Sequence, residues 1–209
     1  MYGRWESGAK IDVAQRLMGQ MLDSLQGIQE EGNFQLALRV YGHQKPVPPQ
    51  DCSDTRLEVP FSNGNIYKIK RVLKAIKPKG TTPIAGSLLK ASYDFPPCAD
   101  CRNIVILITD GVEACDGDPC VVSKRLQQKG IILKPFVIGI GLDEDFKDSF
   151  ECVGTYFDAA DENTFKNVLG VVISQALDNT TAQINLLDNR GKPTETNVPI
   201  LLYDHTSQK

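Results

Sequence analysis

The amino-acid sequence predicts an α/β domain, built as a doubly wound, Rossmann-like and mostly parallel sheet with helices on both faces. The first observation is the segment Asn103–Gly111 (NIVILITDG), a continuous apolar run that ends at a turn. Such a run is typical of a strand buried on both faces, as in a parallel sheet. The second observation is that strand-like runs alternate with helical patterns along most of the chain, which indicates βαβ units.

The individual elements follow in the order that this fold requires. Apolar residues at helical spacing predict a first helix, which Ser7 caps and Gly27 and Gly32 end. Strands are expected next at Gln35–Tyr41 and Arg56–Phe61. The other expected elements are helices at Asn65–Ile76, Pro83–Tyr93, Asp118–Lys129, Glu144–Val153 and Asp161–Leu177, and strands at Ile131–Ile140 and Thr155–Ala159.

The alternation of strands and helices stops near the C-terminal end of the sequence. Residues 1–178 are therefore expected to form the α/β domain. Beyond them, Gln183–Leu187 and Val198–Tyr203 flank a turn and predict a hairpin. We expect residues 179–209 to hold a linker and the first strands of an all-β domain of the β-sandwich type. That domain is expected to be cut short, because roughly thirty residues cannot build one.

Charge and hydrophobicity exclude several classes of protein. The chain has 209 residues, of which 41% are hydrophobic, and this fits one core of ordinary size plus some extra material. The net charge of -3, with both signs interspersed, provides no basic stripe for nucleic acid and no cluster for anionic lipid. No apolar stretch approaches the roughly 18 residues that a membrane span needs. A signal peptide is also not found in the sequence shown.

The role of the cysteines indicates the cellular compartment, because in a reducing cytosol cysteines would normally be metal ligands or redox groups. There are six: Cys52, Cys98, Cys101, Cys115, Cys120 and Cys152. Cys98 with Cys101, and Cys115 with Cys120, have the spacing of zinc knuckles. The two pairs flank the Asn103 strand and lie roughly 25 Å apart, too far for one zinc ion or for a disulfide between the pairs. A disulfide between Cys115 and Cys120 is the better expectation, because the DGDP loop between them can turn the chain back. The partners of Cys52 and Cys152 stay open.

Two segments place polar groups at the carboxyl edge of the predicted sheet. Asp110 ends the buried strand, and open α/β sheets bind ligands beyond their strand ends; a plain Asp-Gly turn is the alternative. Thr81 and Thr82 directly precede a helix, where one of them could serve merely as its cap. Because both segments lie on one edge, a threonine hydroxyl and the aspartate can face one hard cation. Oxygen ligands of this kind suit Mg²⁺, Ca²⁺ or Mn²⁺ rather than zinc.

The segments GTTPIAGSL and ILITDG, in this order and separated by one helix, resemble the von Willebrand factor type A (vWA) domain and its metal-ion-dependent adhesion site. MYGRWESGAKIDVAQ, ALRVYGHQ, ITDGVEACDGDPC and FVIGIG resemble bacterial members of that family, so the resemblance covers residues 1–178. It implies Thr82 as the direct hydroxyl ligand and Asp110 as the acidic partner, often acting through water. It also implies a cation that completes its coordination with a carboxylate of a partner protein.

The resemblance also implies a ligand face around the cation. Thr81 and Gly111 belong to that face, and Tyr2 and Trp5 would lie near it, where they either contact a partner or cover the first helix.

The chain departs from the family pattern at its beginning. Members of the family open with a buried strand that ends in Asp-x-Ser-x-Ser and supplies further metal ligands, whereas Met1–Arg4 corresponds to residues just after that motif. The missing strand is expected between the strands at Gln35–Tyr41 and Asn103–Asp110. With one hydroxyl and one carboxylate left, we expect Mg²⁺ to bind weakly if at all, because Mg²⁺ releases its waters reluctantly.

The leading hypothesis is a non-enzymatic, extracytoplasmic module for protein binding or adhesion that acts through a divalent cation. Two alternatives stay open: a Rossmann-like metal-dependent enzyme that uses Asp110, and a degenerate, metal-free scaffold domain. A glycine-rich phosphate loop is not evident, because Gly139 and Gly141 lack the third glycine and the helix spacing. The identity of the ligand and the oligomeric state do not follow from the sequence.

Overall fold

The structure is a computed structural model that describes residues 1, 3–30, 34–98, 100–142 and 148–177. The chain divides into two units, Met1–Leu177 and Asp178–Lys209, and the fold below is that of the first unit. The hairpin and the all-β domain predicted within residues 179–209 lie outside the described residues, as does Tyr2.

Strands and helices alternate along the first unit. The strands are β1 (Arg4–Trp5), β2 (Gly8–Ala9), β3 (Leu36–Tyr41), β4 (Thr55–Ser62), β5 (Ile106–Thr109), β6 (Phe136–Ile140) and β7 (Thr155–Ala159). The helices are α1 (Lys10–Glu30), α2 (Ile66–Ala75), α3 (Ile84–Ala91), α4 (Pro119–Gln128), α5 (Asp148–Glu151) and α6 (Glu162–Leu177).

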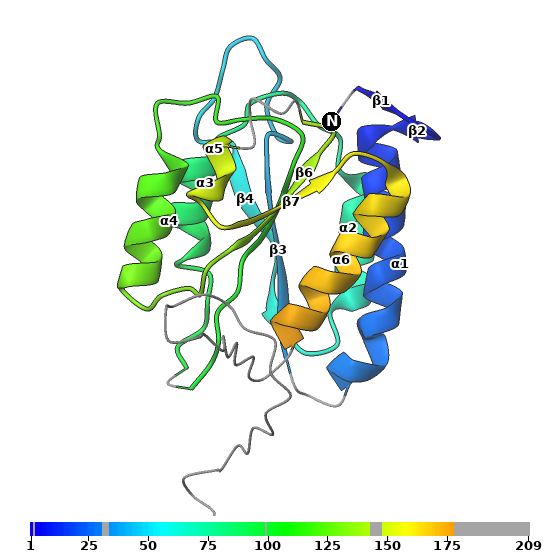
Figure 1. Cartoon of the computed structure of the whole chain (residues 1–209), viewed down its shortest axis with the longest axis vertical. Helices are drawn as coiled ribbons and strands as arrows, with labels where there is room; N and C mark the ends of the chain where they lie inside the picture. The colour runs from blue at the N-terminus through cyan, green and yellow to red at the C-terminus, as the bar shows by residue number, and fades with distance from the viewer. Residues whose placement is uncertain (2, 31–33, 99, 143–147, 178–209) are drawn as a thin grey trace, which may run out of the picture. The chain divides into compact units, whose positions relative to one another are not determined.

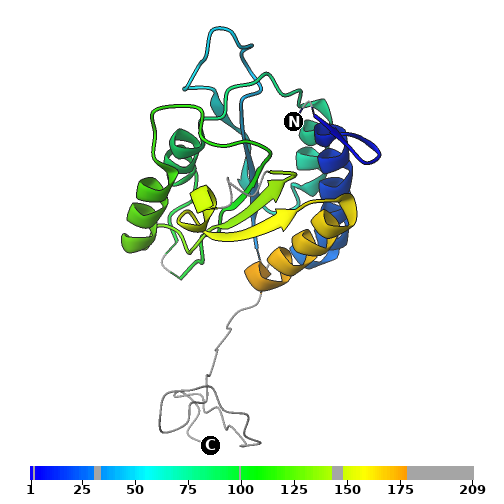
Figure 2. The same cartoon turned by 45° about the horizontal axis from the view of Figure 1, so that its top comes forward.

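A parallel sheet with helices on both faces forms the centre of the unit (Figures 1 and 2). Its strand order is β5-β6-β7, and Ile106 of β5 lies opposite Phe136 of β6, which lies opposite Thr155 of β7. Figure 1 shows α1, α2 and α6 to one side of this sheet and α3, α4 and α5 to the other. The predicted α/β class is therefore confirmed.

The middle strand of that sheet supplies both halves of the core. Neighbouring residues Val137 and Ile138 of β6 are fully buried, and a strand directs successive side chains to opposite faces. Ile138 packs with residues of α1 and α6, whereas Val137 packs with residues of α3 and with Phe150 of α5. A strand covered on both faces must be apolar throughout, which is why the segment FVIGI contains no polar side chain.

Two strands are shorter than the sequence predicts. β5 begins at Ile106 rather than at Asn103, and β6 begins at Phe136 rather than at Ile131. Pro135 directly precedes β6 and has no N–H to donate to a ladder, so regular pairing starts after it. At the N-terminal end, β1 and β2 form a short antiparallel hairpin, and helix α1 consequently starts at Lys10, beyond the predicted cap Ser7.

The strands fall into separate sheets, because β3 pairs only with β4, in antiparallel fashion, and no backbone ladder in the described part of the chain joins β3 to β5. The Tyr41 hydroxyl reaches across and donates a hydrogen bond to the Ile108 carbonyl oxygen (3.4 Å). Burial raises the pKa of Tyr41 to about 12, so this hydroxyl remains a donor.

Two cavities of about 230 and 240 Å³ lie in this region. Residues that line the first include Met18, Leu38, Leu88, Ile106 and Leu107.

We expect a longer form of the chain, which supplies a buried strand ending in Asp-x-Ser-x-Ser, to be more stable and to bind Mg²⁺ more tightly. The cavities lie where that strand is expected. At about 24 cal/mol per Å³ of cavity, filling either one would stabilise the fold by at most about 6 kcal/mol. Thermal melting and Mg²⁺ calorimetry check this, with a glycine- and serine-rich segment of equal length as the control extension. Equal melting temperature and equal affinity would show that the first motif of the vWA family does not belong upstream of Met1.

Candidate functional site

Three loops meet at the carboxyl ends of β3 and β5. We call them the proline loop (residues 42–54, between β3 and β4), the threonine loop (residues 76–83, between α2 and α3) and the aspartate loop (residues 110–118, between β5 and α4). The proline loop projects at the top of Figure 1. The proline and aspartate loops follow the carboxyl ends of β3 and β5, and the threonine loop leads into α3. The threonine and aspartate loops contain the predicted metal ligands Thr82 and Asp110.

The structure brings the predicted hydroxyl and carboxylate to a common space. Thr82 and Asp110 both line the cavity of about 240 Å³, which reaches this edge of the sheet. The Thr82 hydroxyl lies against Gly111, since a methyl group placed on Gly111 would be 3.8 Å from Thr82 Oγ1. The Ala114 N–H donates to the Thr82 carbonyl oxygen (3.0 Å) and so fixes the threonine loop to the aspartate loop.

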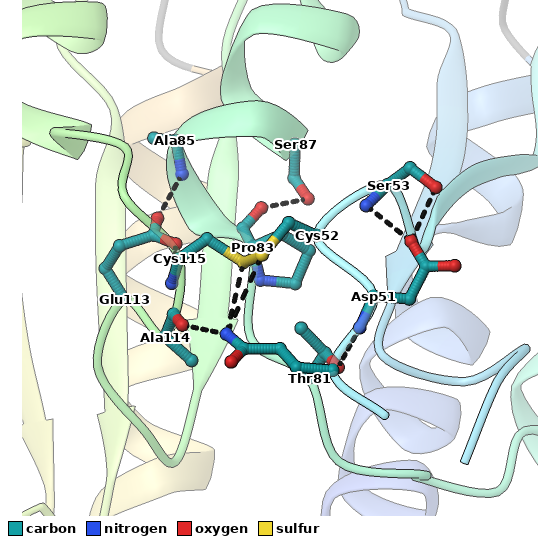
Figure 3. Close-up of a disulfide and its surroundings, with 11 residues drawn as sticks. Asp51, Cys52, Ser53, Thr81, Pro83, Ala85, Ser87, Glu113, Ala114 and Cys115 are labelled. Carbon is teal, nitrogen blue, oxygen red and sulfur yellow. Dashed lines mark hydrogen bonds between the residues drawn. A yellow bond between two sulfur atoms is a disulfide. The ribbon is translucent and has the colours of Figure 1, made fainter. Parts of the chain in front are cut away.

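Thr81, in contrast, has a structural role. Its side chain is buried, and its hydroxyl accepts a hydrogen bond from the Asp51 N–H (3.2 Å), as Figure 3 shows. Asp51 in turn accepts bonds from the N–H and the hydroxyl of Ser53 (2.8 and 2.6 Å) and contacts the Lys45 ammonium. The Lys45 ammonium, and then Ser53, hold the pKa of Asp51 below its usual range. Thr81 and Asp51 therefore join the proline loop to the threonine loop.

Asp110 already has a partner in this chain, the α-amino group of Met1. Its carboxylate accepts a hydrogen bond from the α-ammonium of Met1 and forms an ion pair with it. Burial, and then the charge of Lys10, lower the pKa of this α-ammonium to about 6. The Lys10 ammonium itself donates to the carbonyl oxygens of Ile140 (3.0 Å) and Gly141 (3.1 Å) at the end of β6. The α-amino group of Met1 thus occupies the carboxylate that a bound cation would need.

Glu113 is close to the site but serves another purpose. Its two carboxylate oxygens accept from the N–H of Ala85 (2.6 Å) and the N–H of Cys115 (2.9 Å). Helix α3 begins after Pro83, which has no side-chain cap of its own, so Glu113 provides the cap from the next loop. Sequence reasoning missed this role, because no local pattern signals a cap that lies 28 residues along the chain.

The side chains present supply part of a coordination shell. A hydroxyl and a carboxylate are the oxygen donors that hard cations prefer. Mg²⁺ requires near-octahedral coordination, so waters and a ligand would have to complete the shell. Across the residues that the structure describes, no group of three or more His, Cys, Asp or Glu side chains is placed to hold a metal ion. The assignment of Thr82 and Asp110 as metal ligands stays a prediction.

The prediction that Cys115 pairs with Cys120 is wrong. Cys115 bonds to Cys52 of the proline loop, with 5.9 Å between the Cα atoms, and Cys120 bonds to Cys152. The loop between Cys115 and Cys120 does not turn back, because Asp118 caps α4 and carries Cys120 into the helix. The remaining two cysteines, Cys98 and Cys101, pair with each other.

Trp5 is buried, which decides between the two roles that the sequence left open for it. Its side chain is 8% exposed, its ring packs edge-on against Phe165, and its indole N–H donates to the Ala160 carbonyl oxygen (2.9 Å). Of the two roles left open for this residue, covering the first helix is the one observed, because Trp5 packs with Val13 and Leu17 of α1.

Two curated proteins of Bacillus subtilis (strain 168) are similar to the chain in sequence. The uncharacterized protein YwmC is 29% identical over 187 residues, which are 85% of this chain and 78% of YwmC. The uncharacterized protein YwmD is 30% identical over 139 residues, 64% of this chain and 60% of YwmD. The chain thus spans less than two thirds of YwmD. No protein-family model matches it.

Several solved structures share the fold. BatB from Bacteroides thetaiotaomicron has a TM-score of 0.63 at 18% identity, covering 84% of this chain and 92% of BatB. The pilus adhesin SpaC from Lactobacillus rhamnosus GG has a TM-score of 0.65 at 15% identity, covering 81% of this chain and 28% of SpaC. Proximal thread matrix protein 1 from the mussel byssus, with a zinc-occupied MIDAS motif, has a TM-score of 0.61 at 19% identity, covering 80% of this chain and 43% of that protein.

The fold is vWA-like. This similarity concerns the arrangement of strands and helices. Sequence identities this low do not show which ligands the chain binds. Within the described ranges, the vWA-like unit contains no helix that is long and apolar enough to cross a membrane.

We expect Gly42→Ala to disturb the site far more than Gly64→Ala. Both glycines have φ +64°, where a side chain is strained, but a Cβ on Gly42 would lie 2.1 Å from the Thr81 carbonyl oxygen, whereas one on Gly64 meets nothing within 4 Å. The threonine loop must therefore move in Gly42→Ala, at a cost of about 1 to 3 kcal/mol beyond that of Gly64→Ala. Urea unfolding measures the difference, and equal losses of stability would contradict the close approach.

Proposed function

We propose that this vWA-like chain is a non-enzymatic protein-recognition module that holds a divalent cation with Thr82 and Asp110. The convergence of these residues supports the proposal: the Thr82 hydroxyl lies against Gly111, the neighbour of Asp110, and both residues line one cavity. A bound cation would supply a Lewis-acidic centre for an anionic group of the partner. Thr82 donates a neutral oxygen and Asp110 one negative charge, so a divalent ion keeps net positive charge and attracts a carboxylate of the partner protein.

The surroundings of the site support a protein as the partner. Residues 44–50 of the proline loop are exposed one after another, and Val47 retains 46% of its surface in contact with solvent. The loop is nevertheless held in place, since the Val47 N–H donates to the Lys79 carbonyl oxygen (3.3 Å) and the Lys79 N–H donates to the Gly42 carbonyl oxygen (2.6 Å). The loop exposes the apolar residues Pro46, Val47, Pro48 and Pro49. Because it is already held in place, a partner could bind it without the entropic cost of ordering the loop, which favours association.

The comparisons add indirect support. One protein of the same fold carries zinc at a MIDAS motif, and another is a pilus adhesin. We extend the cation and the adhesive role to this chain as part of the proposal. Disulfides persist mainly in oxidising compartments, so the three disulfides favour a location outside the cytoplasm.

A metal-free scaffold is the second candidate. The hydrogen bond from the Met1 α-amino group to Asp110 favours it, because this contact already occupies the carboxylate. Divalent-cation titration separates the two functions. The enzyme alternative would instead require stabilisation of the fold by a nucleotide or another small substrate, which thermal-shift measurements test.

We expect Thr82→Ala and Asp110→Asn each to weaken Mn²⁺ binding by at least about tenfold, which is the usual consequence of disturbing a metal shell. Asp116→Asn is the matched control, because this exposed acid belongs to the same aspartate loop. Calorimetry, or Mn²⁺-induced broadening of NMR signals where binding is weak, measures the affinities. Unchanged affinity in both variants would place any metal elsewhere and leave the scaffold as the better function.

A further inference from the structure

The three loops of the candidate site are joined pairwise into a closed junction. The proline loop contacts the threonine loop through the bond from the Asp51 N–H to Thr81 Oγ1 (3.2 Å). The threonine loop contacts the aspartate loop through the bond from the Ala114 N–H to the Thr82 carbonyl oxygen (3.0 Å). The Cys52–Cys115 disulfide closes the ring by joining the proline loop to the aspartate loop covalently (Figure 3).

A glutamine side chain reinforces the covalent link. Gln50 Nε2 donates to the Ala114 carbonyl oxygen and lies 3.6 Å from the sulfur atoms of both Cys52 and Cys115. Ala114 therefore has its carbonyl oxygen held from the proline loop and its N–H bonded to the threonine loop. Ala114 consequently links the proline loop to Thr82.

We propose that the Cys52–Cys115 disulfide, with Gln50 lying across it, positions the Thr82 hydroxyl relative to Asp110 and thereby sets the cation affinity of the site. This inference rests on the proposed cation-binding function. Cys52, Cys115 and Gln50 are positioning residues, because they act on Thr82 through Ala114. Groups that orient metal ligands typically contribute about 10- to 100-fold to metal affinity.

The other disulfides do not share these contacts. Cys98 and Cys101 precede β5, at the opposite end of that strand from Asp110. Cys120–Cys152 joins the first turn of α4 to the residue after α5 and closes a segment of 32 residues, against 63 for Cys52–Cys115. Since chain-entropy stabilisation varies only with the logarithm of loop length, Cys120–Cys152 is a control of comparable effect on stability.

The test compares Cys52→Ser/Cys115→Ser with Cys120→Ser/Cys152→Ser in the whole chain. Mn²⁺ affinity is measured by NMR line broadening at a temperature at which melting curves show both variants folded. We expect the first double variant to bind Mn²⁺ at least about tenfold more weakly than the unmodified chain, and the second to change affinity by less than about threefold. Equal affinities of the two variants would overturn the proposal.

Hydrogen exchange provides a readout that needs no metal. We expect loss of Cys52–Cys115 to speed exchange of the Ala114 N–H at least about tenfold more than loss of Cys120–Cys152 does, because the bond to Thr82 opens locally. If the unmodified chain binds no Mn²⁺, the proposed function fails. The exchange rate of the Ala114 N–H then still tests whether the Cys52–Cys115 disulfide positions the threonine loop. Should the first double variant not fold, Gln50→Ala replaces it and keeps the disulfide. Unchanged Ala114 exchange in Gln50→Ala would then overturn the inference.

Discussion

The separation of β3 from β5 is the constraint on which the rest of the vWA-like unit depends. Adjacent strands of one sheet are held by a ladder of backbone hydrogen bonds, but here the two sheets must be joined by side chains. The described links include the Tyr41 hydroxyl on Ile108, the Cys52–Cys115 disulfide, and the two-bond ion pair of Arg39 in β3 with Asp94 after α3 (both 2.7 Å). Helix α1 contributes as well, because it packs into the cores on both sides.

This arrangement concentrates the restraints at the carboxyl edge of the sheet. The disulfide and the Tyr41 hydroxyl are both on or next to the loops that follow β3 and β5, so the ends of these strands are held more firmly than their middles. The cavities lie along the same interface. The described cavities therefore lie beside a carboxyl edge that the disulfide and the Tyr41 hydroxyl hold together.

Much of this fold could be predicted from sequence because its strongest signals are local. The buried runs ending at Thr109 and Ile140 and the helical stripe of α1 depend on residues adjacent along the chain. The β1–β2 hairpin was missed because strands of two residues leave no period to detect. The disulfide pairing failed for a different reason: six cysteines allow many connectivities, and the correct one joins loops 63 residues apart. The role of Trp5 could not be decided from the sequence, because its partner Phe165 comes from the last helix of the unit.

The acidic residues of the site separate into two groups once their partners are known. Glu113 caps α3, Asp118 caps α4, and the buried Asp54 accepts from the N–H groups of Gln44 and Lys45. Each of these carboxylates accepts hydrogen bonds from backbone N–H groups that would otherwise be buried without a partner or left uncapped at a helix end. These three carboxylates therefore have a structural role. Asp110 differs, because its described partner is the α-amino group of Met1 rather than a backbone amide N–H. Replacement of the Met1 α-amino group by a metal ion would leave the helix caps made by Glu113 and Asp118 intact. This distinction follows from the hydrogen-bond partners and not from the sequence, in which all four residues are simply acidic residues in or next to turns.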